Sequence, residues 1–312
     1  MAHHLTTRFL PAAIMIVGAV TVSACGGPGE NTKDAPPAAG PIPVITDPSQ
    51  ITLPTDAYLP TVAQVRQVVQ AQDAVAAVCM REFGFAGQTT TLVGVDEEPR
   101  RRLTHSPLYG YFDVVGNQSK GYDNVLRPDQ SIPAGSGPAH TPSVEEQIAF
   151  TGSGITAGQA TDKINGKSVP PGGCSGKGRD TVGNAPIISD TSLPDGGPKI
   201  PTTDPRIVEA YAKWSACMRA KGYSYKDPVA ANLDQKWHQP SETQQASTEQ
   251  VATATADVEC KLAGNTVGVV VAVQNAYAKQ YVEANAAKLA TFRQQTDDLL
   301  RRAAQVLAGS QG

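Results

Sequence analysis

The chain has 312 residues, a formal net charge of −3, 29 glycines, 24 prolines and only 5% aromatic residues. A charge so close to zero gives no electrostatic case for nucleic-acid binding. The length allows two domains, but the scarcity of aromatic residues and the abundance of glycine and proline predict a thin core in a loop-rich body.

Residues 1–24 have the pattern of a secretory signal peptide. A short cationic start that includes Arg8 precedes an apolar run from Phe9 to Val22, which is too short for a membrane span of roughly 20 residues. The small residues before Cys25 resemble the lipobox of bacterial lipoproteins, in which the cysteine carries lipid such as palmitate and becomes the mature N-terminus. The sequence therefore predicts lipidation of Cys25 and a place on the extracytoplasmic face of the cell membrane; the alternative is an ordinary cleaved signal with Cys25 incidental.

The next segment, residues 25–54, is small, polar and rich in proline. Such a composition cannot bury enough apolar surface to order itself, so we expect a disordered tether. A helix is predicted to begin at Thr55-Asp56, which are good N-cap residues, and to end at Phe83 before Gly84. Its apolar face consists of Val65, Val68, Val75, Cys79 and Phe83, which recur at helical spacing.

Periodicity fails over residues 86–200, where Gly, Pro, Ser, Thr and Asn dominate. Short helices are predicted at Glu97–Leu103 and Ser143–Phe150. A structureless stretch of this length is unusual in a compact domain. We interpret it as an irregular lobe pinned by Cys174, with residues 184–203 as a linker.

Helical patterns return after residue 204. Asp204-Pro205 is an N-cap followed by a proline at the first helical position, and Gly222 closes this helix. A polar helix is predicted at Glu242–Leu262, and a last helix at Thr266–Leu307 whose heptad-like stripe suggests packing against an antiparallel neighbour. The predicted fold is mainly α, with terminal helices in a bundle or long helical hairpin and a disulfide-pinned middle lobe.

One motif, C-M-R-x-x-G-aromatic, occurs twice, at Cys79–Phe85 and at Cys217–Tyr223. It combines a cysteine, a flexible apolar Met, a cation near the negative end of a helix and a glycine stop. A structural role is favoured over a redox or catalytic one, because reactive thiols normally lie at helix N-termini or in electropositive sites.

Cys79, Cys174, Cys217 and Cys260 remain once Cys25 is set aside, and four cysteines in an exported chain favour two disulfides with three possible connectivities. Each copy of the motif is followed by one further cysteine, which favours Cys79–Cys174 and Cys217–Cys260. No cysteine pair has the C-x₂₋₄-C spacing of a zinc site, and His105, His140 and His238 are far apart, so neither a metal nor a cofactor is expected.

An ordered set of sequence blocks resembles a family of uncharacterised exported proteins and lipoproteins from actinobacteria. The blocks are Cys79-Met80-Arg81 with Gly84, Asn165-Gly166-Lys167, Pro171–Cys174, Trp214–Arg219, and Ala256–Cys260 followed by a long helix. The resemblance covers most of the chain after the tether. It implies an exported, lipid-anchored protein and brings no activity with it.

The sequence contains no nucleophile elbow, zincin, P-loop or dinucleotide-binding motif in a suitable context. Neighbouring acids such as Glu145-Glu146 and Asp297-Asp298 are interpreted as surface residues, since adjacent side chains of a helix face apart. The one aromatic concentration of the irregular region is a possible glycan- or peptide-binding surface, although a satellite core beneath a long loop is favoured. It consists of Tyr109, Tyr111, Phe112 and Tyr122.

These patterns favour a membrane-anchored, non-enzymatic binding or structural protein of the cell envelope, with an envelope protein or cell-wall component as partner. A divergent cell-wall hydrolase or modifying enzyme is the first alternative. A solute-binding receptor is the second, although alternating β-α units are missing. The predicted organisation is a signal peptide (1–24), a tether (25–54), a helix with a loop-rich lobe (55–183), a linker (184–203) and a helical region (204–312).

Overall fold

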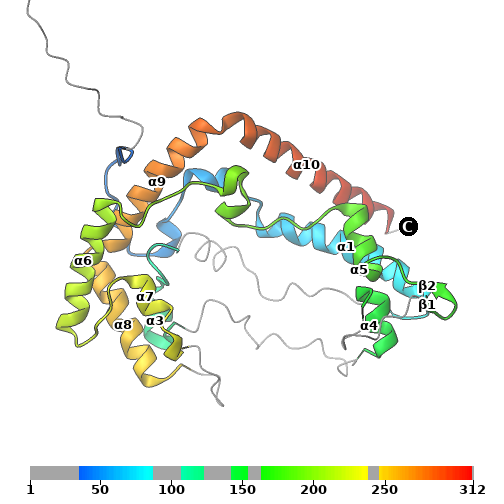
Figure 1. Ribbon diagram of the computed structural model, residues 1–312, viewed down its shortest axis with the longest axis horizontal. Helices are drawn as coiled ribbons and strands as arrows, with labels where there is room; N and C mark the ends of the chain where they lie inside the picture. The colour runs from blue at the N-terminus through cyan, green and yellow to red at the C-terminus, as the bar shows by residue number, and fades with distance from the viewer. Residues whose placement is uncertain (1–34, 87–106, 123–141, 154–162, 238–245, 311–312) are drawn as a thin grey trace, which may run out of the picture. The chain divides into compact units, whose positions relative to one another are not determined.

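The computed structural model describes residues 35–86, 107–122, 142–153, 163–237 and 246–310. Residues Pro37–Gly312 form one compact unit, which is mainly helical as predicted (Figure 1). Within the described ranges, strands occur only in the small antiparallel hairpin of β1 (Lys163–Ile164) and β2 (Lys167–Ser168). The predicted signal peptide, the lipidation site Cys25 and the short helix predicted at Glu97–Leu103 lie outside the described residues.

The first long helix, α1 (Val62–Glu82), begins later than predicted. A short 3₁₀ turn, η2 (Pro54–Tyr58), precedes it, and the break falls at Pro60, which cannot donate a backbone hydrogen bond. The N-cap is Thr61, whose side chain accepts a hydrogen bond from the Gln64 amide at 3.2 Å, while the Gln64 side chain accepts one from the Thr61 amide at 2.8 Å. This reciprocal capping box defines the helix start.

Two helices from the region predicted as irregular pack beside α1. They are α4 (Val144–Thr151), which matches the prediction at Ser143–Phe150, and α5 (Gly173–Val182). The glycines of α5 allow a close approach, since a Cβ on Gly178 would lie 2.6 Å from the Gln72 carbonyl oxygen of α1. Tertiary packing therefore orders a glycine-rich segment that has low intrinsic helix propensity.

A second set of helices packs around α8 (Thr248–Ala263). It comprises α3 (Val114–Lys120), α6 (Pro205–Ala220), α7 (Pro228–Asn232) and α9 (Thr266–Ala284). Valines occur along α9 at positions that a surface helix would leave polar, and Val267, Val270, Val271 and Val273 are all buried. The helix is apolar around most of its circumference, as expected of a helix covered on several sides.

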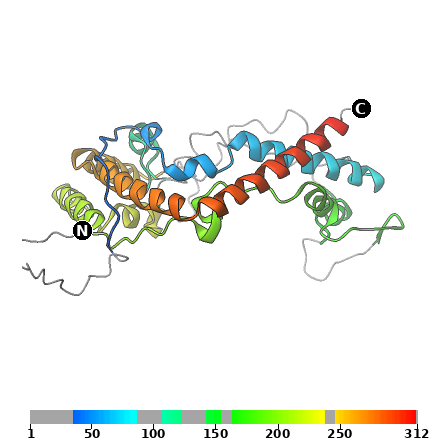
Figure 2. The same ribbon diagram turned by 90° about the horizontal axis from the view of Figure 1, so that it is seen from above.

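The last predicted helix is two helices. The backbone leaves helical geometry at Asn285, and α10 (Ala286–Gly309) follows (Figure 2). The stripe on α10 does bury Leu289, Leu299 and Ala303. However, α10 runs parallel to α1: Arg293 reaches the carbonyl oxygen of Ala57, whereas Leu300 lies beside Gln67, further along both segments. The antiparallel expectation is wrong, because a stripe indicates a buried face without fixing the direction of the neighbour.

The predicted tether ends earlier than residue 54. Residues 37–53, which we call the strap, contain the 3₁₀ turn η1 (Pro48–Gln50), and Ile45, Ile51 and Leu53 are buried. The predicted linker 184–203 is likewise packed, with the turns η3 (Asp190–Ser192) and η4 (Pro194–Gly196) and with Leu193 buried between them. Isolated apolar residues in proline-rich sequence are enough to dock an extended segment when a core is available.

Candidate functional site

The two copies of C-M-R-x-x-G-aromatic end α1 and α6 in the same way. The amide of Phe85 donates to the Met80 carbonyl at 3.1 Å, and the amide of Tyr223 donates to the Met218 carbonyl at 2.9 Å. The intervening Gly84 and Gly222 have φ angles of 87° and 90°. This is a Schellman-type helix end, which requires a left-handed residue and strongly favours glycine.

Each copy is cross-linked to a neighbouring helix. Cys79 bonds to Cys174 of α5 with a Cα–Cα distance of 5.5 Å, and Cys217 bonds to Cys260 of α8 at 5.7 Å. The pairing favoured by the repeated motif is therefore confirmed. The motif has a structural role in both places, since its Met side chain is fully buried and the sulfur of its cysteine is part of a disulfide.

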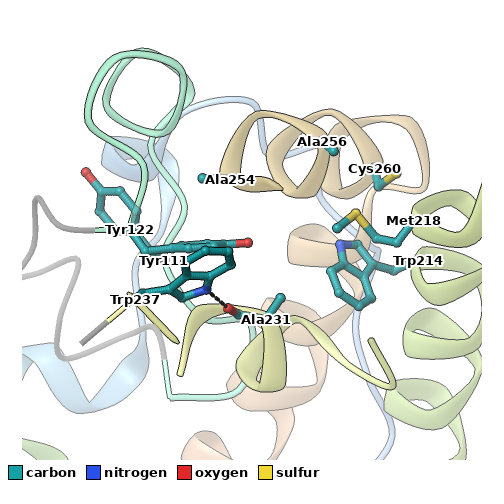
Figure 3. Close-up of a cluster of buried hydrophobic side chains, with 9 residues drawn as sticks. All are labelled: Tyr111, Tyr122, Trp214, Met218, Ala231, Trp237, Ala254, Ala256 and Cys260. Atoms are coloured by element: carbon teal, nitrogen blue, oxygen red, sulfur yellow. Dashed lines mark hydrogen bonds between the residues drawn. The ribbon is translucent and has the colours of Figure 1, made fainter. Parts of the chain in front are cut away.

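The aromatic residues predicted as a possible binding surface are core residues. Tyr109, Tyr111, Phe112 and Tyr122 are each no more than 5% exposed. Their burial contradicts the binding-surface prediction and agrees with the interpretation as core residues. They share their clusters with α8 and α9 and do not form a separate satellite core. Figure 3 shows Tyr111 and Tyr122 beside Trp237, whose indole nitrogen donates to the Ala231 carbonyl at 2.8 Å.

A buried ion pair lies next to this cluster, on the inner face of α8. The ammonium of Lys261 is 2.8 Å from Oδ2 of Asp257 and 2.6 Å from the carbonyl oxygen of Tyr111. Asp257 also accepts hydrogen bonds from the Trp214 indole at 3.0 Å and from the Tyr122 hydroxyl at 3.2 Å. Both charged side chains are completely buried. Together these bonds join α6, α8 and the residues on both sides of α3.

Burial dominates the electrostatics of this site. Desolvation raises the pKa of the Asp257 carboxyl and lowers the pKa of the Lys261 ammonium, while the attraction and hydrogen bond between them oppose both changes. The bonds from Tyr122 and Trp214 also oppose the rise at Asp257. Desolvation and the neighbouring Asp257 charge raise the pKa of Tyr122. The pair was not recognised in the sequence, although the i, i+4 spacing of Asp257 and Lys261 around the disulfide-forming Cys260 places all three near one face of α8.

A shallow groove lies beside α10 at its first turns. Its lining includes Tyr58, Arg293, Gln294, Asp297 and Arg301. The Arg293 guanidinium stacks over the Tyr58 ring at 4.8 Å and donates to the Ala57 carbonyl at 2.8 Å. Arg301 pairs with Asp298. The arginines of the groove therefore have partners within the protein.

The predicted surface acids differ in burial. Glu145 and Asp297 are exposed, as interpreted, whereas Glu146 of α4 is only 4% exposed. Within the described part of the chain, no group of three His, Cys, Asp or Glu residues could hold a metal ion. The histidines His105, His140 and His238 lie outside the described residues.

No family model, curated protein or solved structure matches this chain. Searching the helices of the described residues finds none with the length and apolar character needed to cross a membrane.

Proposed function

We propose that the chain is a lipoprotein held by Cys25 on the extracytoplasmic face of the bacterial cell membrane, and that it serves the envelope as a non-enzymatic binding or structural protein. The resemblance to actinobacterial exported lipoproteins is part of this proposal. The observation that carries it is the cysteine pairing. Cys79, Cys174, Cys217 and Cys260 are all in disulfides, which persist in oxidising compartments. Cys25 is then the odd cysteine, directly after a signal-like sequence.

A non-enzymatic role is supported by the burial of the most highly connected titratable groups. The side chains of Asp257 and Lys261 have no solvent-accessible surface. A general acid or base must reach the proton that it transfers, directly or through one water. This buried pair thus serves to hold helices together, which is the commoner role of a buried ion-pair network.

Lipidation is tested with Cys25→Ala, compared with Ser23→Ala as a control that keeps a small residue before the cysteine. Cells grown with an alkyne-tagged fatty acid are fractionated, and the protein is examined for label. We expect the parent and Ser23→Ala to be labelled and membrane-bound, and Cys25→Ala to lose the label. Unchanged labelling of Cys25→Ala in the membrane fraction would overturn lipidation at this residue.

The binding role is tested by cross-linking in living cells, followed by titration of the purified mature protein with the captured component and with purified peptidoglycan. We expect saturable binding to one of them without a change in the ligand. Peptidoglycan turnover by the mature protein, lost in a folded single-residue variant, would replace this proposal with the hydrolase alternative.

A further inference from the structure

The strap, residues 37–53, is held by polar contacts at two points along α9 and its neighbour α6. At its start, the Pro37 carbonyl accepts a hydrogen bond from the Arg206 guanidinium at 2.9 Å. Further along, Asn265 makes a double contact: its amide nitrogen donates to the Pro43 carbonyl at 2.8 Å, and its side-chain oxygen accepts from the Ile45 amide at 3.3 Å. These bonds satisfy backbone groups that a proline-rich segment cannot pair within itself.

Both polar contacts come from side chains that are themselves fixed. Asp204 holds the Arg206 guanidinium in a bidentate pair, with distances of 2.9 and 2.6 Å. Asn265 is the N-cap residue of α9 and has a left-handed φ of 45°. A preorganised partner loses little side-chain entropy when it binds the strap, so each hydrogen bond keeps more of its strength.

The strap also lies in direct contact with the α9 backbone. A Cβ on Gly268 would lie 2.0 Å from the Pro43 carbonyl oxygen, a distance that no side chain tolerates. Just beyond this crossing, Ile45 and Ile51 are 4% and 1% exposed and pack with Val267 and Val270 of α9. The strap is therefore held by close packing against the α9 backbone, by burial of its apolar side chains and by hydrogen bonds.

We infer that the strap is a clamp that sets how far the folded unit stands from its lipid anchor. This inference rests on the proposed function, because it needs the lipid at Cys25. With the strap docked, 12 residue steps separate Cys25 from Pro37, since 37 − 25 = 12. Chain geometry limits the reach of such a linker to about 40 Å. With the strap released, 29 steps separate Cys25 from Pro54, since 54 − 25 = 29, and the limit on the reach rises to about 100 Å.

The test measures the distance between the folded unit and the membrane. The mature lipidated protein carries a fluorophore at Val208→Cys, an exposed site on α6, and is reconstituted into phosphatidylcholine vesicles with a headgroup-linked acceptor dye. This cysteine is the single free thiol, because four others are paired and Cys25 is thioether-linked. Gly268→Val is compared with Gly309→Val, a helical glycine with nothing within 4 Å of the added Cβ.

A third variant lengthens the linker without touching the strap. It inserts 17 Gly and Ser residues between Cys25 and Pro37, which matches the released length because 54 − 37 = 17. Energy transfer is expected to fall by about twofold or more in both Gly268→Val and the insertion variant, because the longer linker permits a larger separation from the membrane. It is expected to stay at the parent value in Gly309→Val.

Hydrogen exchange of the amides of residues 44–47 and 49–53 reports release of the strap in the same samples. Faster exchange in Gly268→Val without a fall in energy transfer overturns the clamp, as does unchanged exchange in that variant. If Gly268→Val loses its disulfides or helix content, Asn265→Gly replaces it, since glycine keeps the left-handed backbone and removes both side-chain bonds. Failure of the proposed function is seen separately, because an unlipidated parent does not float with the vesicles.

Discussion

At the scale of single residues, the Asp257–Lys261 pair carries a large desolvation cost because both charges are buried. Each charge has lost all contact with water, and the loss is offset only by the mutual attraction and by bonds to Tyr111, Tyr122 and Trp214. An apolar pair of similar volume is often as stable as a buried ion pair. The contribution of the pair is to positioning: the hydrogen bond from Lys261 to the Tyr111 carbonyl holds the segment before α3 against α8.

Removing one partner of this pair is expected to destabilise the protein strongly. Asp257→Asn keeps the side-chain shape but leaves the Lys261 ammonium without a counter-charge, which costs about 3–5 kcal/mol of unfolding free energy. Lys261→Met is expected to cost a similar amount. The double variant should recover part of the loss, because no lone charge then remains buried. Urea unfolding at pH 7 measures all three.

The control is another Lys–carboxylate pair of i, i+4 spacing, Glu209 and Lys213 on the exposed face of α6. Glu209→Gln is expected to leave the unfolding midpoint unchanged. An Asp257→Asn variant as stable as this control would show that the buried pair does not hold the segment in place.

At the scale of elements, caps decide where the helices begin and end. Thr61 begins α1 and Asp204 begins α6, and the two Schellman-type ends at Gly84 and Gly222 stop the same helices. These signals are local, so the sequence predicted the bounds of α6 closely. The predicted start of α1 was wrong because Thr55 and Asp56 lie inside the turn η2, which ends at Tyr58, and the chain passes through Pro60 before Thr61 caps the helix.

Asp204 links a helix cap to the strap, and its charge gives a pH dependence. The hydrogen bond from the Arg206 side chain holds the pKa of the Asp204 carboxyl below its usual range, with a further contribution from Tyr277. Because the folded-state pKa lies below the unfolded value of about 4, the charged form adds stability above that pH, and this stability is lost as the pH falls through the folded pKa.

Asp204→Asn is therefore expected to lower the unfolding free energy at pH 7 by about 2 kcal/mol, the range for hydrogen bonds to charged groups. The difference from the parent should shrink as the pH falls below about 4, because the parent then loses the same charge. Urea unfolding at pH 7, 5, 4 and 3 measures this. Asp195→Asn, in an exposed pair with Lys288, is the control and should change stability by less than about 0.5 kcal/mol at any pH. A constant difference between Asp204→Asn and the parent would contradict the assignment.

At the scale of the whole molecule, two disulfides tie the motif helices to neighbours that are distant in sequence. The bridges have sequence separations of 95 and 43 residues. In the chain-entropy model, closing loops of these lengths restricts the unfolded state by about 5 and about 4 kcal/mol. The bridge that closes the longer loop therefore restricts the unfolded chain more.

Cys79→Ala with Cys174→Ala is expected to destabilise the protein by up to about 5 kcal/mol, and Cys217→Ala with Cys260→Ala by up to about 4 kcal/mol. Thermal and urea unfolding of the two double variants measures the difference. Peptide mapping of the parent without reduction should recover a Cys79–Cys174 peptide and a Cys217–Cys260 peptide. A Cys79–Cys217 link would contradict the fold.

The sequence by itself determined the helical class, the ends of α6 and the cysteine pairing. Each rests on a signal carried by a few neighbouring residues: the spacing of apolar side chains, the cap at Asp204-Pro205, and a repeated motif with one cysteine after each copy. Such signals can be recognised in the sequence because their physical cause, a satisfied helix end or an apolar face, involves only neighbouring residues.

Only the tertiary structure decided which polar and irregular segments are buried. The strap, the aromatic residues around Tyr111 and the glycine-rich α5 are ordered by partners far away in sequence, such as Asn265, Lys261 and Gln72. Periodicity cannot reveal these contacts, because their stabilisation comes from long-range burial and from single hydrogen bonds rather than from any pattern along the chain. The direction of α10 beside α1 likewise follows from long-range contacts, such as that between Gln67 and Leu300.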